Sequence, residues 1–298
     1  MTEVKTLVYG IYPKRDELRI KLGRWERGNI ETRELLESLK AETDGAIDQF
    51  QSEGITLFTD PLFNWYDFLR PLLESLKGVK LGPLTRIDET NTFYRLPVIQ
   101  DLGDILFDPT DFGVLEDNPP LPLYLSAGRS NLAFFPGPFT VLNMSRVEPG
   151  LDRITLLNRL ADTYAKIRKA AGYQKVFLFE YSPGKIDAPD IYRKIAEPEN
   201  TYLYIRGKFP INAFRRSKVR VESIIVSASE NSLDSVSRYC RTPGIQIVDS
   251  HTTRIEGRDE ILQRIPDTLK SAIVTHQDYM DFLPRVIADQ KVHLLGGL

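Results

Sequence analysis

Eight short apolar runs recur along the chain, and this repetition restricts the fold more than any other feature. Each is rich in β-branched or aromatic residues and ends in Gly, Asp, Glu, Ser or His. They cover residues 6–10, 55–60, 139–145, 175–180, 201–207, 223–229, 245–250 and 272–276. Apolar runs without alternation, with polar residues at the carboxyl end, are typical of parallel strands buried on both faces. We therefore predict eight parallel strands.

The segments between these runs have the apolar spacing of amphipathic helices. The i, i+3, i+4 pattern predicts helices over 32–54, 152–172 and 257–271, and the first two end near Gly54 and Gly172. Eight strands alternating with helices predict an α/β fold of the (β/α)8 TIM-barrel type. A doubly wound open sheet is the alternative, but no G-x-G-x-x-G follows the first run.

Residues 101–138 interrupt this alternation. They are dense in Pro, Gly and Asp, which predicts an inserted loop with a hairpin. The chain shows no internal repeat, no block of like charge and no linker that divides it. We therefore expect residues 1–298 to form a single domain.

Composition restricts the partners and the compartment. The net charge of −2 over 298 residues predicts neither a nucleic-acid partner nor an anionic membrane surface. The first residues lack the apolar core of a signal peptide, and no apolar run reaches 18 residues. The single cysteine, Cys240, excludes an internal disulfide and any site with two thiolates. We expect a cytoplasmic protein.

Polar residues that follow the last two strands are candidates for a site, because functional side chains of a barrel lie at the carboxyl ends of its strands. Asp249 and His251 follow the seventh run, and His276 and Asp278 end the eighth. These four side chains are candidates for a metal site. The alternative is that both histidines bond at strand ends or face solvent.

Three basic residues follow the first strand. Lys14 and Arg15 lie one helical turn before Arg19, so the three can meet an anion at the barrel mouth. A solvated helix start is the alternative interpretation. The chain has neither a G-x-S-x-G elbow nor a P-loop, so hydrolase and nucleotide-kinase functions have no support.

Several segments, taken in order, resemble one enzyme family. They are GIYPKRDELRIKLGRWERGNI, QFQSEGITLFTDPLFNWYDFL, ETNTFYRLP, PGPFTVLNMS, AAGYQKVFLFEYSPG, IQIVDSHTTRIE and THQDYMDFLPRVIADQKVHLL. Together they resemble the cobalamin-independent methionine synthases, over nearly the whole chain. That family has two similar barrels, and this chain resembles the amino-terminal one. The Phe63-to-Asp67 stretch carries this distinction, because the carboxyl-terminal barrel has an Asp-Gly-Glu motif where this chain has TDPLF.

The resemblance implies that the zinc site of the family is vacated here. The catalytic barrel holds zinc through a His-x-Cys, a Glu and a last-loop Cys, and the metal binds homocysteine as its thiolate. The matching positions carry Tyr204, Arg206 and Asp278, with Glu230 displaced from the glutamate position. A Tyr, an Arg and an Asp do not form a thiophilic zinc site. We therefore expect no catalytic residue, metal or other cofactor in this chain, and zinc on a partner.

The resemblance also suggests where a ligand binds. In the amino-terminal barrel an early basic segment helps hold the polyglutamate tail of the folate. That segment matches Lys14, Arg15 and Arg19, although Asp16 stands where the family usually has Arg. Further candidates for substrate or anion binding, at strand ends and in the matched segments, are Tyr66, Asp67, Asn91, Tyr94 and Glu180.

Three functions remain open at this point. The leading hypothesis is a non-zinc subunit of a methionine synthase, which transfers a methyl group to homocysteine in methionine biosynthesis. It docks on a separate catalytic core and helps bind the methyl donor, a methyl-folate or another carrier. The second is a self-sufficient methyltransferase with a site rebuilt around Asp249, His251, His276 and Asp278. The third is a non-catalytic barrel that binds a pterin or folate or acts as a scaffold.

Overall fold

Eight parallel strands form one curled sheet in the computed structural model, which describes residues 3–87, 93–102, 121–126 and 128–298. The strand order is β2-β1-β11-β10-β9-β8-β7-β5. The strands are β1 (Glu3–Val8), β2 (Leu57–Phe58), β5 (Ala133–Pro136), β7 (Val176–Glu180), β8 (Thr201–Ile205), β9 (Val221–Val226), β10 (Cys240–Val248) and β11 (Ser271–His276). All their pairings are parallel.

The two edge strands of this sheet, β2 and β5, meet at the point where the ring closes. Thr59, directly after β2, pairs in parallel with Leu132, directly before β5. The Asn131 backbone amide donates to the Phe58 carbonyl at 3.2 Å, and the Asn131 side-chain oxygen accepts from the Phe58 amide at 2.8 Å. The sheet is therefore a (β/α)8 barrel, and the predicted fold class is confirmed.

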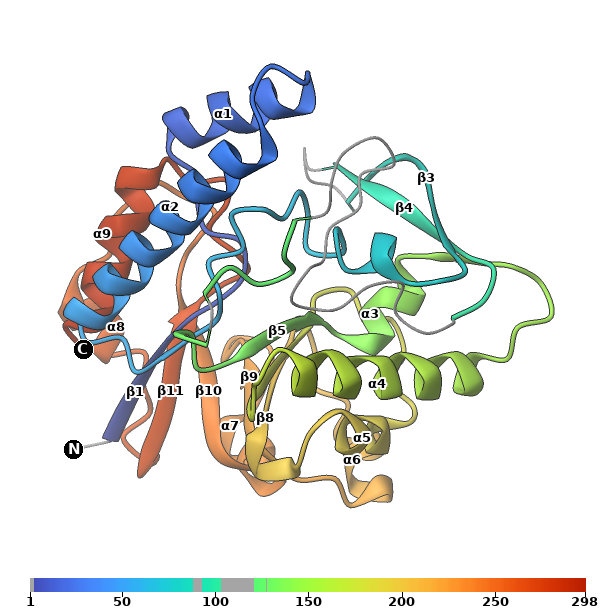
Figure 1. Cartoon of the computed structure of the whole chain (residues 1–298). Coiled ribbons are helices and arrows are strands. Elements are labelled where there is room, and N and C mark those ends of the chain that lie inside the picture. The colour runs from blue at the N-terminus through green and yellow to red at the C-terminus, as the bar shows by residue number, and fades with distance from the viewer. Residues whose placement is uncertain (1–2, 88–92, 103–120, 127) are drawn as a thin grey trace.

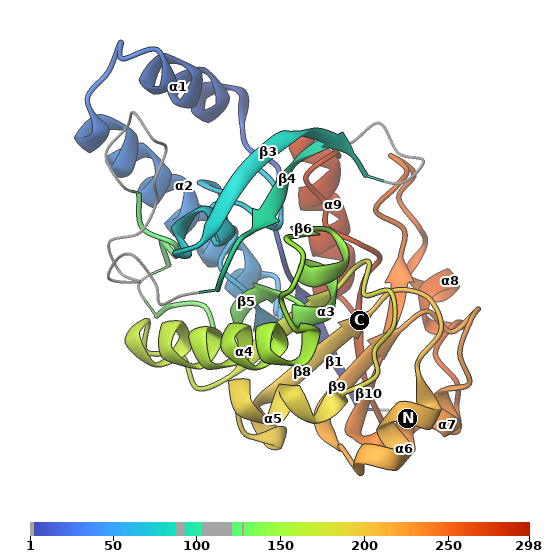
Figure 2. The same ribbon diagram turned by 90° about the vertical axis from the view of Figure 1, so that its right-hand side faces the viewer.

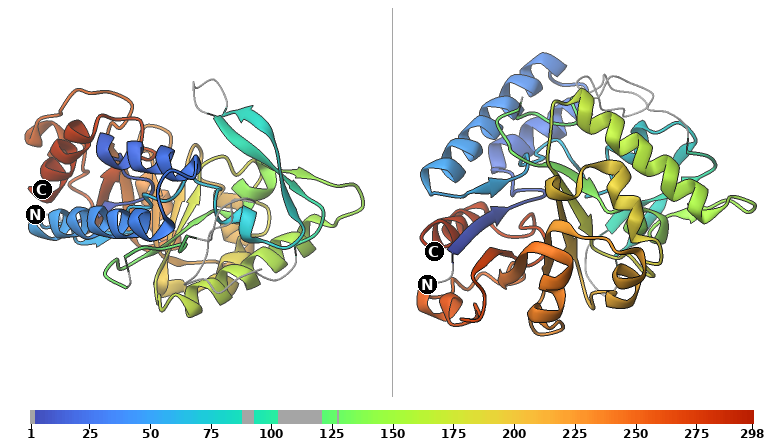
Figure 3. Two further views of the ribbon diagram at one scale, coloured as in Figure 1. Left: turned by 45° about the horizontal axis from the view of Figure 1, so that its top comes forward. Right: turned by 90° about the horizontal axis from the view of Figure 1, so that it is seen from below.

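Helices surround the sheet on its outside (Figures 1 and 3). The long ones are α1 (Asp16–Glu26), α2 (Thr32–Ser52), α4 (Arg153–Ala170) and α9 (Arg285–Gly296). The short ones are α3 (Pro138–Asn143), α5 (Tyr192–Ile195), α6 (Ile211–Ser217), α7 (Leu233–Val236) and α8 (Arg258–Leu262). Figure 1 shows α2 and α9 side by side, and Arg285 of α9 pairs with Glu42 of α2. No helix in the described part of the chain is long and apolar enough to cross a membrane.

The third barrel strand lies earlier than predicted. The expected strand 139–145 is wrong, because this segment forms α3, and the strand is β5 at Ala133–Pro136. The buried residues of α3 follow one another without a gap, from Pro138 to Leu142. An element that is buried on every side has the same apolar run whether it is a helix or a strand. Pro138 at the first turn favours the helix.

The helix predicted over 257–271 is shorter than expected, because α8 ends at Leu262 and Pro266 follows in a turn. Proline disfavours a helical conformation of the residue before it. The predicted insertion also has a different layout. A hairpin of β3 (Val79–Arg86) and β4 (Phe93–Ile99) precedes residue 101, and β4 pairs with β6 (Arg146–Val147). Figure 2 shows this small sheet close to α3. Residues 103–120 and 127 of the predicted insertion lie outside the described residues.

Aromatic rings fill the inside of the barrel near the carboxyl ends of the strands. The Tyr9 ring, just after β1, stacks on Phe177 at 4.5 Å and on the His276 ring at 4.3 Å. Tyr204 lies 4.7 Å from Phe179 and 5.4 Å from Tyr9, measured between ring centroids. All five residues are buried. The interior is therefore a packed core, as in other barrels of this type. Polar functional side chains are expected in the loops at the carboxyl ends of the strands.

Candidate functional site

Tyr204, Arg206 and Asp278, which the sequence resemblance assigned to the positions of zinc ligands, lie close together in space. Asp278, after β11, accepts a 2.8 Å hydrogen bond from the Tyr204 hydroxyl at its Oδ1. Its Oδ2 lies 2.9 Å from His251 Nε2 and 4.0 Å from Arg206 Nε. We name these four residues the Asp278 cluster. Three strand ends, those of β8, β10 and β11, supply it, as expected for the functional face of a barrel.

Each member of the Asp278 cluster supports the ionised form of the central carboxylate. Burial would raise the pKa of Asp278, but the His251 hydrogen bond, the Arg206 charge and the Tyr204 hydrogen bond together lower it below its usual range. The same bond to Asp278 raises the pKa of His251, with further help from the Asp249 charge. The cluster therefore favours the charged forms of both His251 and Asp278, which form an ion pair when His251 is protonated.

The donor set of the Asp278 cluster does not fit a zinc ion. Arg206 is cationic, and both oxygens of Asp278 already interact with protein groups. Zinc in a thiol-activating site takes thiolate and imidazole ligands, none of which is offered by Tyr204 and Arg206. Among the described residues, no group of three or more His, Cys, Asp or Glu side chains is placed to hold a metal ion.

The four residues of the rebuilt-site hypothesis contact one another in sequence and do not surround a common metal position. His251 Nδ1 lies 3.4 Å from Asp249 Oδ1, and its other nitrogen faces Asp278. His276 is fully buried, with Nε2 facing the Tyr9 amide at 3.3 Å and Nδ1 facing the Asp278 carbonyl at 2.5 Å. Burial lowers the pKa of His276 to about 4. Both of its ring nitrogens therefore form hydrogen bonds with backbone groups.

A buried ion pair holds the loop that carries His251. Lys291 of α9 and Glu256 are both buried, and their Nζ and Oε2 atoms lie 2.9 Å apart. Lys291 also donates to the Arg254 carbonyl at 2.6 Å, and Glu256 Oε1 accepts from the Asp249 amide at 2.7 Å. The loop after β10 is therefore fixed to α9, which places His251 beside Asp278. Sequence reasoning missed this pair, since a lysine on a helix usually faces solvent.

The basic segment after β1 lines a cavity of about 720 Å³ between the start of α1 and the start of α9. We name it the basic pocket. Its lining residues are Lys14, Arg15, Asp16, Glu17, Arg19, Phe282, Leu283, Pro284 and Arg285. The structure therefore brings the three predicted basic residues together. Arg285 and Phe282 were not foreseen, because they lie in DFLPR, far along the chain.

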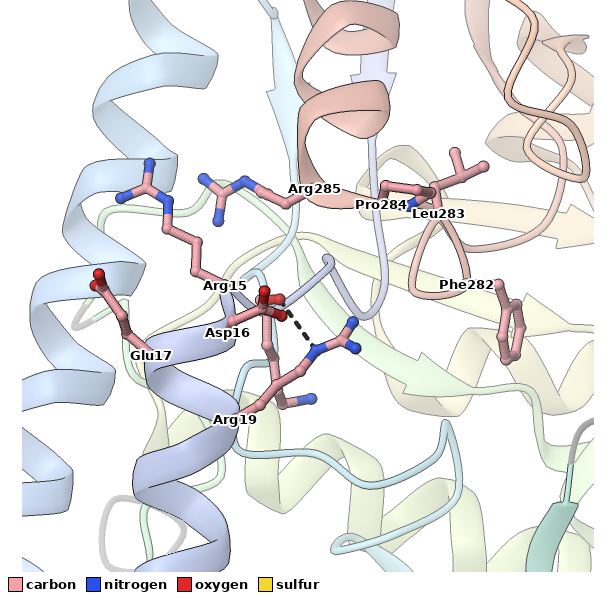
Figure 4. Close-up of a pocket in the computed structure, with 9 residues that line it drawn as sticks. Arg15, Asp16, Glu17, Arg19, Phe282, Leu283, Pro284 and Arg285 are labelled. Atoms are coloured by element: carbon pink, nitrogen blue, oxygen red, sulfur yellow. Dashed lines mark hydrogen bonds between the residues drawn. The ribbon is translucent and has the colours of Figure 1, made fainter.

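The cations of the basic pocket differ in how they are balanced. Arg15 and Arg285 share Glu42, with their nitrogens 3.5 Å and 2.5 Å from its Oε1. Figure 4 shows these two side chains alongside each other. Arg19 donates from Nε to the Lys14 carbonyl at 3.2 Å, and Lys14 donates to the Trp65 carbonyl at 3.1 Å. Within the described residues neither Lys14 nor Arg19 has a carboxylate within 4 Å. These two charges are available to an anion.

The other predicted ligand-binding residues serve the fold. Glu180, fully buried at the end of β7, accepts from the amide of Phe139 and from the amide and hydroxyl of Thr140. It also accepts from the Tyr192 hydroxyl at 2.9 Å. This carboxylate fixes the start of α3 and does not face solvent.

Three more candidates follow β2 or lie in the hairpin. Asp67 Oδ1 accepts from the amides of Leu69 and Arg70, both at 2.9 Å, and Arg70 stacks on the Tyr66 ring at 4.3 Å. The hydroxyl of Tyr94 donates to the Met144 carbonyl at 3.1 Å. Asn91 lies outside the described residues. The structure does not gather these side chains around one ligand position.

Comparison with known proteins connects this barrel to one group of structures. No protein-family model matches the chain, and no curated protein sequence matches it. Among solved structures, a B12-independent methionine synthase from Shewanella sp. W3-18-1, in complex with selenomethionine, is similar at 12% identity with a TM-score of 0.69. The match covers 97% of this chain and 95% of that one.

A second solved structure agrees with the first. A putative vitamin-B12 independent methionine synthase from Listeria monocytogenes is similar at 16% identity with a TM-score of 0.64, over 97% of this chain and 94% of that one. The chain therefore has the fold of these methionine synthases. The resemblance seen in the sequence motifs is confirmed at the level of the fold, and each alignment covers nearly the whole of both chains.

Proposed function

We propose that this chain is a non-zinc component of a methionine synthase system. It docks on a separate zinc-bearing core, and its basic pocket holds the anionic part of the methyl donor, a methyl-folate or a related carrier. The core carries out methyl transfer to homocysteine. We place the system in the cytoplasm, because a single buried cysteine suits a reducing compartment.

One observation carries this proposal: the Asp278 cluster. Three of its four residues, Tyr204, Arg206 and Asp278, occupy the positions matched to the zinc ligands, and the four satisfy one another through hydrogen bonds and ion pairs. The fold of the methionine synthases is kept, but the residues at this site stabilise the folded chain and do not provide ligands for thiol activation. The Shewanella neighbour, in complex with selenomethionine, connects that fold with a methionine-like ligand. Chemistry of the methionine synthase type then needs a second chain with thiolate ligands.

The basic pocket supports the role in donor binding. Lys14 and Arg19 offer charges that no carboxylate within 4 Å balances among the described residues, and Arg15 and Arg285 add two guanidinium groups. Guanidinium groups bind carboxylates in a bidentate way, which suits the glutamate tail of a folate. Phe282, 58% exposed, gives the pocket an apolar rim.

The proposal is tested with purified chain and a core-type methionine synthase. We expect co-purification of the two, and a methyl-transfer rate that rises when this chain is added. The variant Arg19→Met should lower that rise at limiting methyl-folate, whereas Arg33→Met, a change on the exposed face of α2, should not. No association together with no effect on the rate contradicts the proposal.

The pocket alone supports a narrower function, the binding of an anionic pterin or folate without any methyl transfer. A thermal-shift screen with folates, pterins and homocysteine separates the two, because a ligand that binds the folded state raises the melting temperature. A folate-dependent shift in a chain that never affects a core enzyme favours the narrower function.

A further inference from the structure

Two arginines of the basic pocket contact the same carboxylate oxygen, yet they are held very differently. Arg285 Nη1 lies 2.5 Å from Glu42 Oε1, and its side chain is 10% exposed. Arg15 Nε lies 3.5 Å from the same oxygen, and its side chain is 57% exposed. One contact of Glu42 is therefore short and buried, whereas the other is longer and open to solvent.

Arg285 is fixed in its place by several partners. Its Nε donates to Asp289 Oδ1 at 2.7 Å, and its Nη1 also donates to the Pro13 carbonyl at 3.4 Å. The guanidinium group lies over the Tyr12 ring, 4.9 Å from the ring centroid. Detaching a buried, paired charge is costly. We therefore expect Arg285 to stay on Glu42 whatever binds in the pocket.

Arg15 can leave the same carboxylate at little cost. An exposed ion pair contributes little stability. The Arg15 carbonyl accepts from the Arg19 amide at 3.0 Å, at the start of α1, so only the side chain has to rotate. Glu42, whose side chain is 13% exposed, keeps Arg285 as its partner when Arg15 leaves. The movement therefore leaves no buried charge unpaired.

The first anionic group of a ligand has a different place to bind. Lys14 donates to the Trp65 carbonyl and Arg19 donates to the Lys14 carbonyl, and in the described chain no carboxylate lies within 4 Å of either cation. A ligand with one anionic group is satisfied by these two residues. It offers nothing that would draw Arg15 from its carboxylate, whereas a second anionic group on the same ligand does.

We propose that Arg15 is the specificity-determining residue of the basic pocket, and that it exchanges Glu42 for the second anionic group of a ligand. Glu42 holds the guanidinium group until then, and it lowers the affinity for such a ligand by the strength of the ion pair. The inference rests on the anion binding of the proposed function. It narrows the ligand class to dicarboxylates and larger polyanions.

The experiment is titration of the full chain with triglutamate and with butyrate, which has one carboxylate, followed by NMR chemical shifts. Arg15→Met should weaken triglutamate binding on the order of tenfold, as expected for one charge-assisted hydrogen bond. Glu42→Gln should strengthen triglutamate binding about threefold, since it removes the competing ion pair. Neither variant should change butyrate binding by as much.

An exposed ion pair on α2 supplies matched controls. Arg33 and Glu37 lie 3.1 Å apart with side chains 90% and 67% exposed, outside the pocket. Arg33→Met and Glu37→Gln change the net charge in the same way as the two pocket variants, and they should leave the affinity for triglutamate nearly unchanged. Equal effects of the pocket and control variants would show a general effect of charge and overturn the proposal.

The double variant Arg15→Met/Glu42→Gln completes the test. The gain from Glu42→Gln should vanish when Arg15 is absent, and a gain that persists overturns the exchange. Arg15→Met changes an exposed side chain, so it should fold even if Glu42→Gln does not, and an unchanged affinity for triglutamate in this variant overturns the proposal by itself. Binding by the wild type that Glu42→Gln does not strengthen refutes only this inference. No binding by either protein also contradicts the proposed anion binding.

Discussion

The Asp278 cluster and the basic pocket both lie at loops that follow barrel strands, yet their charges are satisfied in opposite ways. In the cluster a carboxylate is surrounded by a tyrosine, a histidine and an arginine. In the pocket Lys14 and Arg19 donate to backbone carbonyls, and in the described chain no carboxylate lies within 4 Å of either. A closed set of partners stabilises the folded chain, whereas open donors stabilise a complex. From this difference we expect the Asp278 cluster to stabilise the fold and the basic pocket to bind an anion.

The largest expected effect concerns the ion pair behind the cluster. Glu256→Ala removes the partner of the buried Lys291 and leaves its charge uncompensated. We expect a loss of about 3–5 kcal/mol in the free energy of unfolding, measured by urea denaturation. The exposed Glu230→Ala is the matched control and should change little. A small loss of unfolding free energy for Glu256→Ala would mean that the ion pair of Lys291 and Glu256 does not hold the loop beside the Asp278 cluster in place.

The buried His276 should make the chain sensitive to acid. Its pKa is about 4 in the folded chain, and the unfolded chain returns it to the ordinary value. The unfolded state therefore takes up a proton first, and stability falls as the pH drops from about 6.5 to about 4, by on the order of 3 kcal/mol in total. His276→Gln should flatten the dependence of the unfolding free energy on pH in this window. An unchanged slope would show that other groups cause the acid sensitivity.

The ion pair of the cluster should have its own pH window. Asp278→Asn is expected to lower the free energy of unfolding by about 1–3 kcal/mol at neutral pH, in the lower part of that range because His251 is half-exposed. The pKa of Asp278 is lowered, so its contribution is lost as the pH falls into the acid range. The pKa of His251 is raised, so its contribution is present below the ordinary imidazole value and is lost at higher pH.

Denaturation of the wild type and of Asp278→Asn at about pH 6 and about pH 9 measures this window. The difference between the two proteins should be smaller at the higher pH, where His251 is neutral. A difference that grows with pH would contradict the ion pair.

The smallest expected effect on stability belongs to the pocket. Lys14→Met removes a partly buried cation that no carboxylate balances within 4 Å among the described residues, so the free energy of unfolding should change by no more than about 0.5 kcal/mol. Binding of an anion such as a glutamate oligomer, measured by calorimetry, should weaken clearly. A loss of stability comparable to that of Asp278→Asn, with unchanged anion binding, would remove the distinction between the two regions.

The sequence predicted the barrel well because its strands are short apolar runs with polar ends. The third strand was missed because α3 is buried on all sides and its run looks like a strand. The three basic residues after β1 were found because they lie together in the chain. Arg285 was missed as their neighbour in the pocket, since only the parallel pairing of β1 with β11 brings the two ends of the chain together.

The Asp278 cluster shows the same limit. Tyr204 and Asp278 were singled out through the family resemblance, but their mutual hydrogen bond joins the ends of β8 and β11, which β9 and β10 separate in the sheet. The role of Glu180 was also not readable from its position at a strand end. The start of α3 is folded over that carboxylate, which leaves it no contact with solvent. Contacts between loops that are distant in sequence are not encoded in any local pattern.

The closure between β2 and β5 has a consequence for the dynamics of the barrel. β2 is only two residues long, and among the described residues the seam has one backbone bridge plus the hydrogen bonds of Asn131. The chain segment between these two strands is also the longest excursion of the barrel. Few hydrogen bonds and a long intervening segment lower the free energy of local opening. Backbone amides at this seam should therefore exchange with deuterium sooner than those of β7 and β8, and the barrel should open along this line first.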